Sequence, residues 1–397
     1  MSFNFFHENP VHQLTKVASL VLLTLGAPVT YSGAFSLYGE VNGRNSGDYG
    51  AGAAVDAEDP STLFYNPAGL VYLKGKQLAL SSTIVKAKST LSDDAYSSLT
   101  TASVPGPDTS LAGLSSNETG LLPSFFYSNE VTDKLTWALG LYVPFGLSTD
   151  WGEESNARYS ATLSKLEVIN ISPAMGVKLT NTLSFGAAFD IQLAAVDFNS
   201  IAGISTTSFP DSISKNHGNS IGFGGHLGVI YEPTINIRIG LNYQSSIVHE
   251  FHGQSTLSGL LAGTTGSYAS ASSDGLTSDP MSMPAQITLS GLYQVNDKLT
   301  LNNTVAFTQW SVFENIALNG VVGSMGTPLA EPVIVSENFK NTWRIAAGMK
   351  YKISNKIKVR LGLGYDQSPT NNIDRSLRLP DSDRIALAAG AHYQANS

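Results

Sequence analysis

The chain has 397 residues, only 14% of them charged, and a formal net charge of −8 at pH 7. The acidic balance argues against a nucleic-acid partner, and the absence of cysteine excludes disulfides and thiolate metal sites. The length suits two or three soluble domains or one large β domain.

Residues 1–32 are predicted to be an export signal. Lys16 supplies a positive charge, residues 17–25 form a short apolar run, and small residues follow it, with cleavage near Ser32. The long leading region with Glu8 departs from the usual form. The apolar run is too short to cross a bilayer as a helix.

Residues 33–74 are predicted to form an N-terminal hatch that contains a short helix. Asp59 followed by Pro60 is typical of a helix start, and Pro67 and Gly69 are expected to end the helix about two turns later. A short, partly apolar helix needs a wall to pack against.

Residues 75–397 supply that wall as segments in which apolar and polar residues alternate. In the segment 183–193, for example, Leu183, Phe185 and Phe189 alternate with Ser184 and Asp190. Alternation over eight or more residues predicts strands with one apolar face. About twelve strands are expected, at residues 76–88, 120–128, 135–147, 160–179, 183–198, 219–232, 236–253, 284–295, 299–317, 340–353, 357–366 and 383–394.

The connections differ between the two ends of the predicted strands. Short turns lie at 129–134, 180–182, 296–298 and 354–356, and long Ser/Gly-rich loops are expected at 89–119, 200–219 and 254–281. This asymmetry is typical of antiparallel transmembrane β-barrels of the outer membrane. A secreted β-sandwich also alternates, but its polar face would carry many Lys and Glu residues.

Six sequence blocks occur in one order over residues 33–394. They include Asn66-Pro67-Ala68-Gly69, and the full set is 33–37, 57–59 with 64–69, 144–147, 339–340 with 343–346, 364–369 and 379–384. Together they resemble the FadL family of outer-membrane transporters for long-chain fatty acids and other hydrophobic compounds.

The resemblance implies a 14-stranded barrel, plugged by a hatch in which Asn66, Pro67, Ala68 and Gly69 act in gating. It also implies that ligand lands on apolar outer loops, enters a pocket, shifts the hatch and leaves sideways near a kinked third strand. Pro144 and Gly146 suit such a kink, because proline cannot donate to the ladder. An ordinary strand end at Pro144 is the alternative.

The family pattern continues for two strands beyond the block that here ends at Tyr393. The last strand is therefore expected either to pair with the first in a twelve-stranded barrel or to leave an open sheet. A truncated gene product is favoured over a redesigned smaller barrel, and a truncated non-functional paralogue is one alternative to the function predicted below. Tyr393 is the nearest candidate for the terminal aromatic that the barrel-insertion machinery reads.

A fatty-acid anion in an apolar pocket needs a cationic donor. The family's basic pair cannot be placed residue by residue, and the candidate cations are Arg158, Lys340 and Arg344. Apolar loop residues are candidates for a docking groove, or alternatively for loop-to-loop packing: Phe209, Leu257, Leu260 and Leu261.

The sequence therefore predicts a passive outer-membrane transporter for long-chain fatty acids or similar hydrophobic molecules, with no catalytic residues, cofactor or metal. His249 and His252 would face opposite sides of a strand, which argues against a metal pair. Expected partners are the ligand, outer-membrane lipid and lipopolysaccharide, and the insertion machinery. The alternatives are an aromatic or aliphatic hydrocarbon importer of the same fold, a non-selective porin and a structural barrel.

Overall fold

The computed structural model describes most of the chain after the predicted export signal. The signal and Phe209 lie outside the described residues. The described residues are 35–92, 96–97, 109–203, 211–263 and 267–395.

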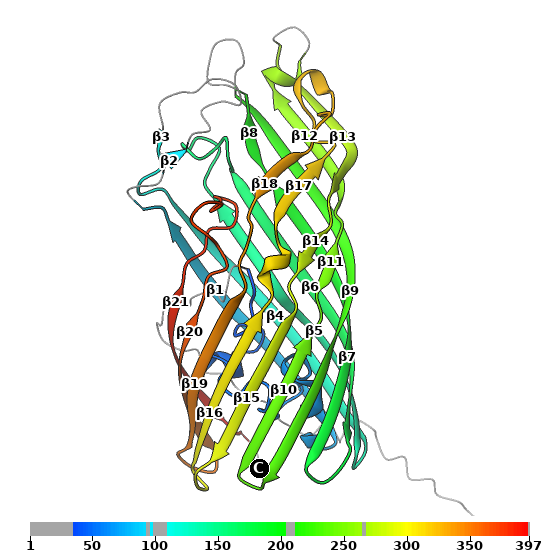
Figure 1. The fold of residues 1–397 in the computed structure, drawn as a ribbon, viewed down its shortest axis with the longest axis vertical. Helices are drawn as coiled ribbons and strands as arrows, with labels where there is room; N and C mark the ends of the chain where they lie inside the picture. Colours follow the sequence, from blue (N-terminus) through cyan, green and yellow to red (C-terminus); the bar gives the residue numbers. More distant parts are fainter. Residues whose placement is uncertain (1–34, 93–95, 98–108, 204–210, 264–266, 396–397) are drawn as a thin grey trace, which may run out of the picture.

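Twelve strands form the barrel wall, joined by eleven successive antiparallel pairings (Figure 1). In wall order they are β1 Lys76–Thr90, β4 Ser115–Thr132, β5 Leu135–Asp150, β6 Leu163–Lys178, β7 Leu183–Phe198, β9 Ser212–Thr234, β10 Ile237–Gln244, β15 Gln286–Gln294, β16 Leu299–Thr308, β19 Thr342–Lys352, β20 Ile357–Asp366 and β21 Arg384–Tyr393. The predicted antiparallel barrel is confirmed.

Shorter elements extend the wall or fill the barrel. The short strands are β2 Tyr96–Ser97, β3 Thr109–Ser110, β8 Ser200–Ala202, β11 Ile247–His249, β12 His252–Gly259, β13 Ala269–Ser278, β14 Met281–Met283, β17 Asn315–Asn319 and β18 Val333–Ser336. The helices are α1 Gly43–Ser46, α2 Thr62–Tyr65, η2 Pro67–Tyr72, η3 Leu260–Ala262, η4 Trp310–Val312 and η5 Ser324–Gly326.

The wall turns its apolar side chains outward and its polar side chains inward. On β7, Phe185, Phe189 and Leu193 are 37–50% exposed, whereas Asp190 and Gln192 are buried. This is the reverse of a soluble protein and suits a barrel surrounded by lipid. None of the helices among the described residues is long and apolar enough to cross a membrane.

Short turns gather at the lower end of the barrel in Figure 1, and the C-terminus lies at the same end. The upper strands extend further than predicted, because residues 212–219, 254–259 and 269–278 are strands rather than loops. These extensions are rich in Ser, Gly and Thr and lack the apolar alternation on which the strand prediction relied. Backbone pairing between β9, β12 and β13 holds them instead.

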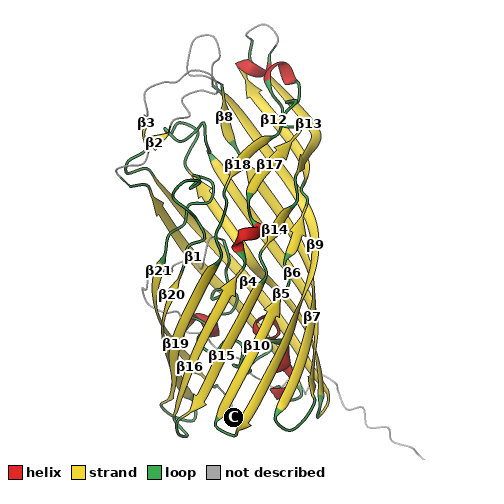
Figure 2. Ribbon diagram, viewed as in Figure 1, coloured by secondary structure: helices red, strands yellow, loops and turns green. Residues whose placement is uncertain are grey.

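The hatch lies inside the lower half of the barrel, where Figure 2 shows its helices. The predicted helix does end before Pro67, but its predicted start at Pro60 and its length of about two turns are wrong, because it begins at Thr62. The helix α2 covers one turn, and Pro67 begins a second helix, η2, whose first turn is capped by the Asn66 side chain. Proline suits that position because its missing N–H is one that the first turn leaves unpaired.

The hatch contacts both end strands of the pairing order. The Gly43 N–H donates to Ser81 Oγ of β1 at 3.0 Å, and Gly47 packs against Gly390 of β21. Among the described residues, no ladder joins β1 directly to β21.

Candidate functional site

Inward-facing glycines of the wall form a seat for the hatch. A Cβ at Gly186 would overlap the backbone of Pro67 and Ala68, and one at Gly228 would overlap the Asn66 side chain. Gly240 and Gly362 lie equally close to other parts of the hatch backbone. Only glycine permits this approach, so the hatch fits against the wall without a layer of side chains between them.

Asn66 fixes the hatch to two wall strands. It is fully buried, and its Nδ2 donates to Ala54 O at 2.8 Å, to Val229 O of β9 at 3.1 Å and to Leu241 O of β10 at 3.3 Å. Its Oδ1 accepts the Ala68 N–H at 3.0 Å. One amide side chain therefore ties the hatch to the wall, while the gating role of residues 66–69 stays a prediction.

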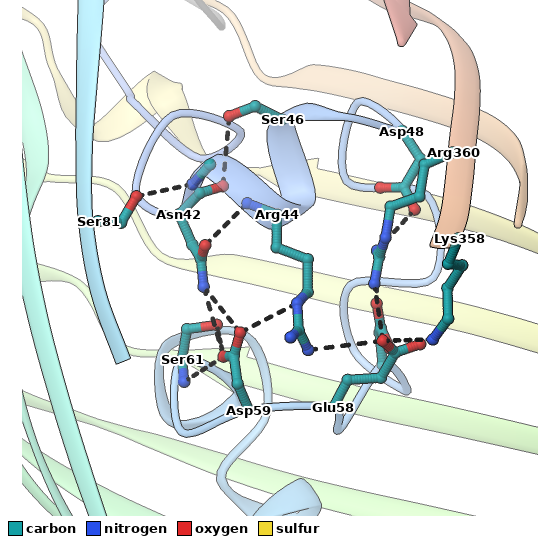
Figure 3. A network of polar contacts seen from close by, with 12 residues as sticks. Asn42, Arg44, Ser46, Asp48, Glu58, Asp59, Ser61, Ser81, Lys358 and Arg360 are labelled. Atoms are coloured by element: carbon teal, nitrogen blue, oxygen red, sulfur yellow. Dashed lines mark hydrogen bonds and ion pairs between the residues drawn. The ribbon is translucent and has the colours of Figure 1, made fainter. Parts of the chain in front are cut away.

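Ion pairs hold the hatch to β19 and β20, and Figure 3 shows those made by Lys358 and Arg360 of β20. Arg360 contacts Asp48, Asp56 and Glu58 at 2.9–3.1 Å, and Lys350 Nζ lies 2.5 Å from Asp56. All of these groups except Glu58 and Lys358 are at least nine-tenths buried. Removing one partner would leave an uncompensated buried charge, which typically costs about 3–5 kcal/mol.

The environment of the hatch shifts the pKa values of Glu58 and Asp48 in opposite directions. Burial raises the pKa of Glu58, but the surrounding lysines and arginines outweigh it and hold that pKa well below its usual range. Burial raises the pKa of Asp48 to about 6 despite the nearby Arg360. Glu58 therefore stays ionised near neutral pH, whereas Asp48 takes up protons as the pH falls through 6.

A cluster of buried apolar side chains that pack against one another lies in the lumen above the hatch and is here called the apolar chamber. Aromatic rings crowd one part of it, with Phe35 4.7 Å from Trp310 and 5.5 Å from Phe313 between ring centroids. Its buried residues come from the hatch lead, the wall and the loops: Phe35, Leu166, Val168, Ala194, Val196, Phe198, Ile247, Phe251, Leu276, Met281, Met283, Trp310, Phe313, Ile316, Leu318, Val321, Phe339 and Leu379.

The wall opens between β4 and β5 beside this chamber. Their ladder ends at Phe125 and Leu141, and among the described residues no β4–β5 backbone pairing lies above that point. A side-chain contact closes the gap higher up, where the Asp150 N–H donates to Ser116 Oγ. Pro123 and Pro144 border the gap, and neither can donate a hydrogen bond to a ladder.

Residues 35–37, the first described residues of the hatch, are called the hatch lead. They pair with β5 at a point where β4 does not. The Leu37 N–H donates to Pro144 O and the Gly146 N–H to Phe35 O, both at 2.9 Å. The pairing of β5 with β6 also shifts register between Tyr142 and Phe145, next to Pro144. The strand is therefore irregular where the kink is predicted.

A cavity of about 1390 Å³ runs through this region. It is lined by Leu37 of the hatch, by Val85 and Leu166 from the inner wall, and by outward residues such as Leu121 and Ile169. Because its lining includes both inward and outward side chains, the cavity connects the lumen to the lipid-facing surface.

The structure separates the three predicted cations. Arg344 lies in the hatch interface, where NH2 donates to Tyr49 O at 2.7 Å and the guanidinium stacks on Tyr38 and Tyr49. Arg158 pairs with Asp211 at 2.9 Å in the upper loops, and Lys340 is exposed. None of the three is a member of the buried apolar cluster that forms the chamber.

Arg378 is the cation at the chamber that the sequence analysis missed. It is buried, it donates to Ser164 Oγ at 3.2 Å and to Asn199 O at 3.3 Å, and it lies over the Phe198 ring. Burial lowers its pKa to about 10, so it remains charged near neutral pH. The sequence signal for this site is that Arg378 stands between Leu377 and Leu379, directly before the block 379–384.

Glu337 lies near Arg378 and shares Ser376 with it. Ser376 Oγ donates to Glu337 Oε1 at 2.6 Å and accepts the Arg378 backbone N–H at 3.2 Å. Burial raises the pKa of Glu337 to about 8, although Ser376 and Arg378 lower it. Glu337 is therefore mostly neutral at pH 7 and leaves the charge of Arg378 unbalanced.

Three of the predicted docking residues are described: Leu257 lies on β12, and Leu260 and Leu261 lie in η3. Leu257 is fully buried and packs with Ala262 and Val322, Leu261 packs against the same cluster, and Leu260 is 37% exposed. This packing matches the loop-to-loop alternative for Leu257 and Leu261. No group of three metal-binding side chains occurs in the described part of the chain.

The barrel, its internal hatch and the chamber define an outer-membrane transport protein of Gram-negative bacteria, and family members are transporters rather than enzymes. Residues 23–397 match the family model described as outer membrane protein transport protein (OMPP1/FadL/TodX). The chain belongs to this family and is a FadL/TodX-type transporter of hydrophobic compounds.

Relatives and solved structures agree with this assignment. The chain is 25% identical to a long-chain fatty acid transport protein of Escherichia coli O6:H1, over 96% of this chain and 88% of that protein. A FadL homologue of Pseudomonas aeruginosa shares the fold with a TM-score of 0.75 and 24% identity, covering 92% and 88% of the two chains. The toluene transporter TodX of Pseudomonas putida shares the fold with a TM-score of 0.69 and 18% identity, over 92% of this chain and 90% of that chain.

Proposed function

We propose that this protein takes up long-chain fatty acids passively and releases them sideways into the outer membrane. The observation that carries this proposal is the gap between β4 and β5, because the cavity passes through it from the lumen to the lipid-facing surface. A ligand that leaves there enters lipid directly and avoids transfer of its tail through water. Outer-membrane lipid and lipopolysaccharide are then its surroundings, and the insertion machinery is its assembly partner.

The hatch lead is the gate in this proposal. Phe35 belongs to the chamber, while Leu37 lines the cavity beside Gly146. Among the described residues, two backbone hydrogen bonds, which together form the Ser36–Phe145 bridge, and the ring contact of Phe35 with Phe145 hold the lead to β5. Ligand in the chamber would compete with Phe35 for the same apolar contacts, so binding favours release of the lead from β5.

Arg378 is the proposed anchor for a carboxylate. It borders the apolar chamber, and its hydrogen-bond acceptors are the neutral oxygens of Ser164 and Asn199. A ligand carboxylate would supply the missing negative charge, while its tail occupies the chamber. The aromatic lining favours a second candidate, an aromatic hydrocarbon, for which Arg378 has no role.

Replacing Gly146 with tryptophan tests the sideways exit. A Cβ at Gly146 already lies 3.1 Å from Leu37 Cδ1, so an indole there would fill the inner mouth of the gap. We expect uptake of radiolabelled oleate by whole cells to fall severely, while the amount of folded barrel stays normal. Leu139→Trp is the matched control, because Leu139 faces outward on the same strand below the gap.

Normal oleate uptake by a folded Gly146→Trp protein would contradict the proposed exit. Large, steady single-channel currents through the unmodified protein would instead favour a non-selective porin over a hatched transporter.

Fatty-acid affinity is expected to fall as the pH rises through about 8. Burial raises the pKa of Glu337 to about 8, so above that pH it ionises and competes with the ligand for Arg378. Equilibrium binding of oleate at pH 7 and 9 measures the effect, and Glu337→Gln should remove it. A pH dependence that is unchanged in Glu337→Gln would assign the titration to another group.

A further inference from the structure

A shallow groove of about 420 Å³ runs across the lipid-facing surface of β1, β4 and β5. Its floor is low because Ser82 and Pro123, a cross-strand pair, are smaller than the outward residues around them. Leu80, Phe125 and Leu141 rise beside it and are 68%, 37% and 42% exposed. The outer surface is therefore concave here, at positions that face lipid.

The groove begins where the gap ends. Phe125 and Leu141, the last β4–β5 pair below the gap, both line the groove. Pro123 lines the groove and also the cavity that passes through the wall. A flexible chain that emerges through the gap therefore meets a continuous surface that leads along the outside of the barrel.

The polarity of the outer surface changes along the same path. Lys165 and Glu167 form an outward ion pair at 2.8 Å on β6 and line the cavity at the height of the gap. Below the gap, Leu80 and Leu139 continue an apolar outer face. A molecule with its polar head near Lys165 and its tail in the groove would be oriented like a lipid of the outer leaflet.

We propose that this groove is an exit site that binds the acyl chain of a single-chain amphiphile after it has passed through the gap. The inference rests on the proposed sideways release and adds a site outside the wall. The occupant is the transported ligand rather than a two-chain bilayer lipid, because the groove is continuous with the gap through one shared residue, Pro123. The groove would hold the tail while the polar head clears the opening.

The absence of cysteine permits a direct binding test with one label. Ile84 lies outward on β1, two residues from Ser82 and outside the groove lining. A fluorophore on Ile84→Cys, with the protein in lipid nanodiscs, reports a nearby acyl chain through quenching by dibromostearate. Leu289→Cys on β15 is the control, because its outward side chain is similarly exposed, at 50% against 55%.

We expect saturable quenching at Ile84→Cys that unlabelled stearate reverses and that Ser82→Phe, which fills the groove, abolishes. Equal, non-saturable quenching at both labelled positions would overturn the proposal, because it would report ordinary partitioning into the bilayer. Equal saturable quenching by a dibrominated phospholipid would also overturn it, by identifying a general lipid site.

Adding Gly146→Trp separates this inference from the proposed function. Stearate in the bilayer reaches the groove from outside, so quenching should persist while oleate uptake is lost. Persistent uptake with normal quenching would reject the sideways exit and keep the groove. Lost uptake without competable quenching would reject the groove and keep the exit.

Discussion

Replacing Arg378 with methionine should weaken fatty-acid uptake at low ligand concentration while uptake of toluene stays unchanged. A hydrogen bond to a charged group contributes about 1.5–3 kcal/mol, so its loss should weaken the apparent affinity for oleate roughly ten- to hundred-fold. Methionine keeps a long apolar side chain against Phe198 and limits the damage to packing. Concentration-dependent uptake of radiolabelled oleate and toluene measures both effects.

Arg344→Met is the informative comparison for this prediction. Arg344 is equally buried, but its contacts are Tyr49 and Tyr38 of the hatch, away from the chamber. The Arg344→Met variant is therefore expected to destabilise the hatch and to leave the relative uptake of oleate and toluene unchanged. Equal losses of oleate and toluene uptake in Arg378→Met would reject the carboxylate anchor and favour the hydrocarbon importer.

Substituting alanine for Gly186 should displace the hatch and make the barrel leak ions. The new methyl group would overlap the backbone of Pro67 and Ala68, which cannot rotate away as a side chain can. Overpacking of this kind typically costs about 1–3 kcal/mol, and here the strain falls on the contact between hatch and wall. Single-channel conductance in planar bilayers measures the leak, and heat-modifiable gel migration checks that the barrel has folded.

Gly120→Ala is the matched control, since a Cβ there meets no atom within 4 Å. It should leave conductance and migration unchanged. Closed channels in a folded Gly186→Ala barrel would show that the hatch tolerates displacement at this contact and would reject the glycine seat.

The wall was predictable because each strand repeats a simple pattern. The bounds 183–198 and 357–366 agree with β7 and β20, since lipid outside and polar contacts inside impose a period of two residues. The upper extensions were missed because their buried positions are largely Ser and Asn, so apolar residues do not alternate with polar ones there. Gly186 and Gly240 stand at polar-side positions of this alternation, but the alternation does not reveal that the hatch backbone lies against them.

The candidate site was less predictable because its parts are distant in sequence. Pro144 and Gly146 suggested a kink, but the gap also depends on Pro123 and on the hatch lead, which meet only in the folded barrel. Arg378 lies in a loop without periodicity, so no local pattern marks it as buried. Side chains from separate loops and strands form the chamber, and a single sequence does not reveal such neighbours.

The close fit between hatch and wall has a consequence for the order of assembly. Thr304 Oγ1 donates to Gly50 O, 254 residues earlier, and the glycine seat leaves no side-chain layer to yield during a late insertion. We therefore expect the hatch, which is exported first, to dock against the early strands before the later strands complete the wall around it. A hatch supplied as a separate chain to a finished, hatchless barrel should then fail to restore low conductance.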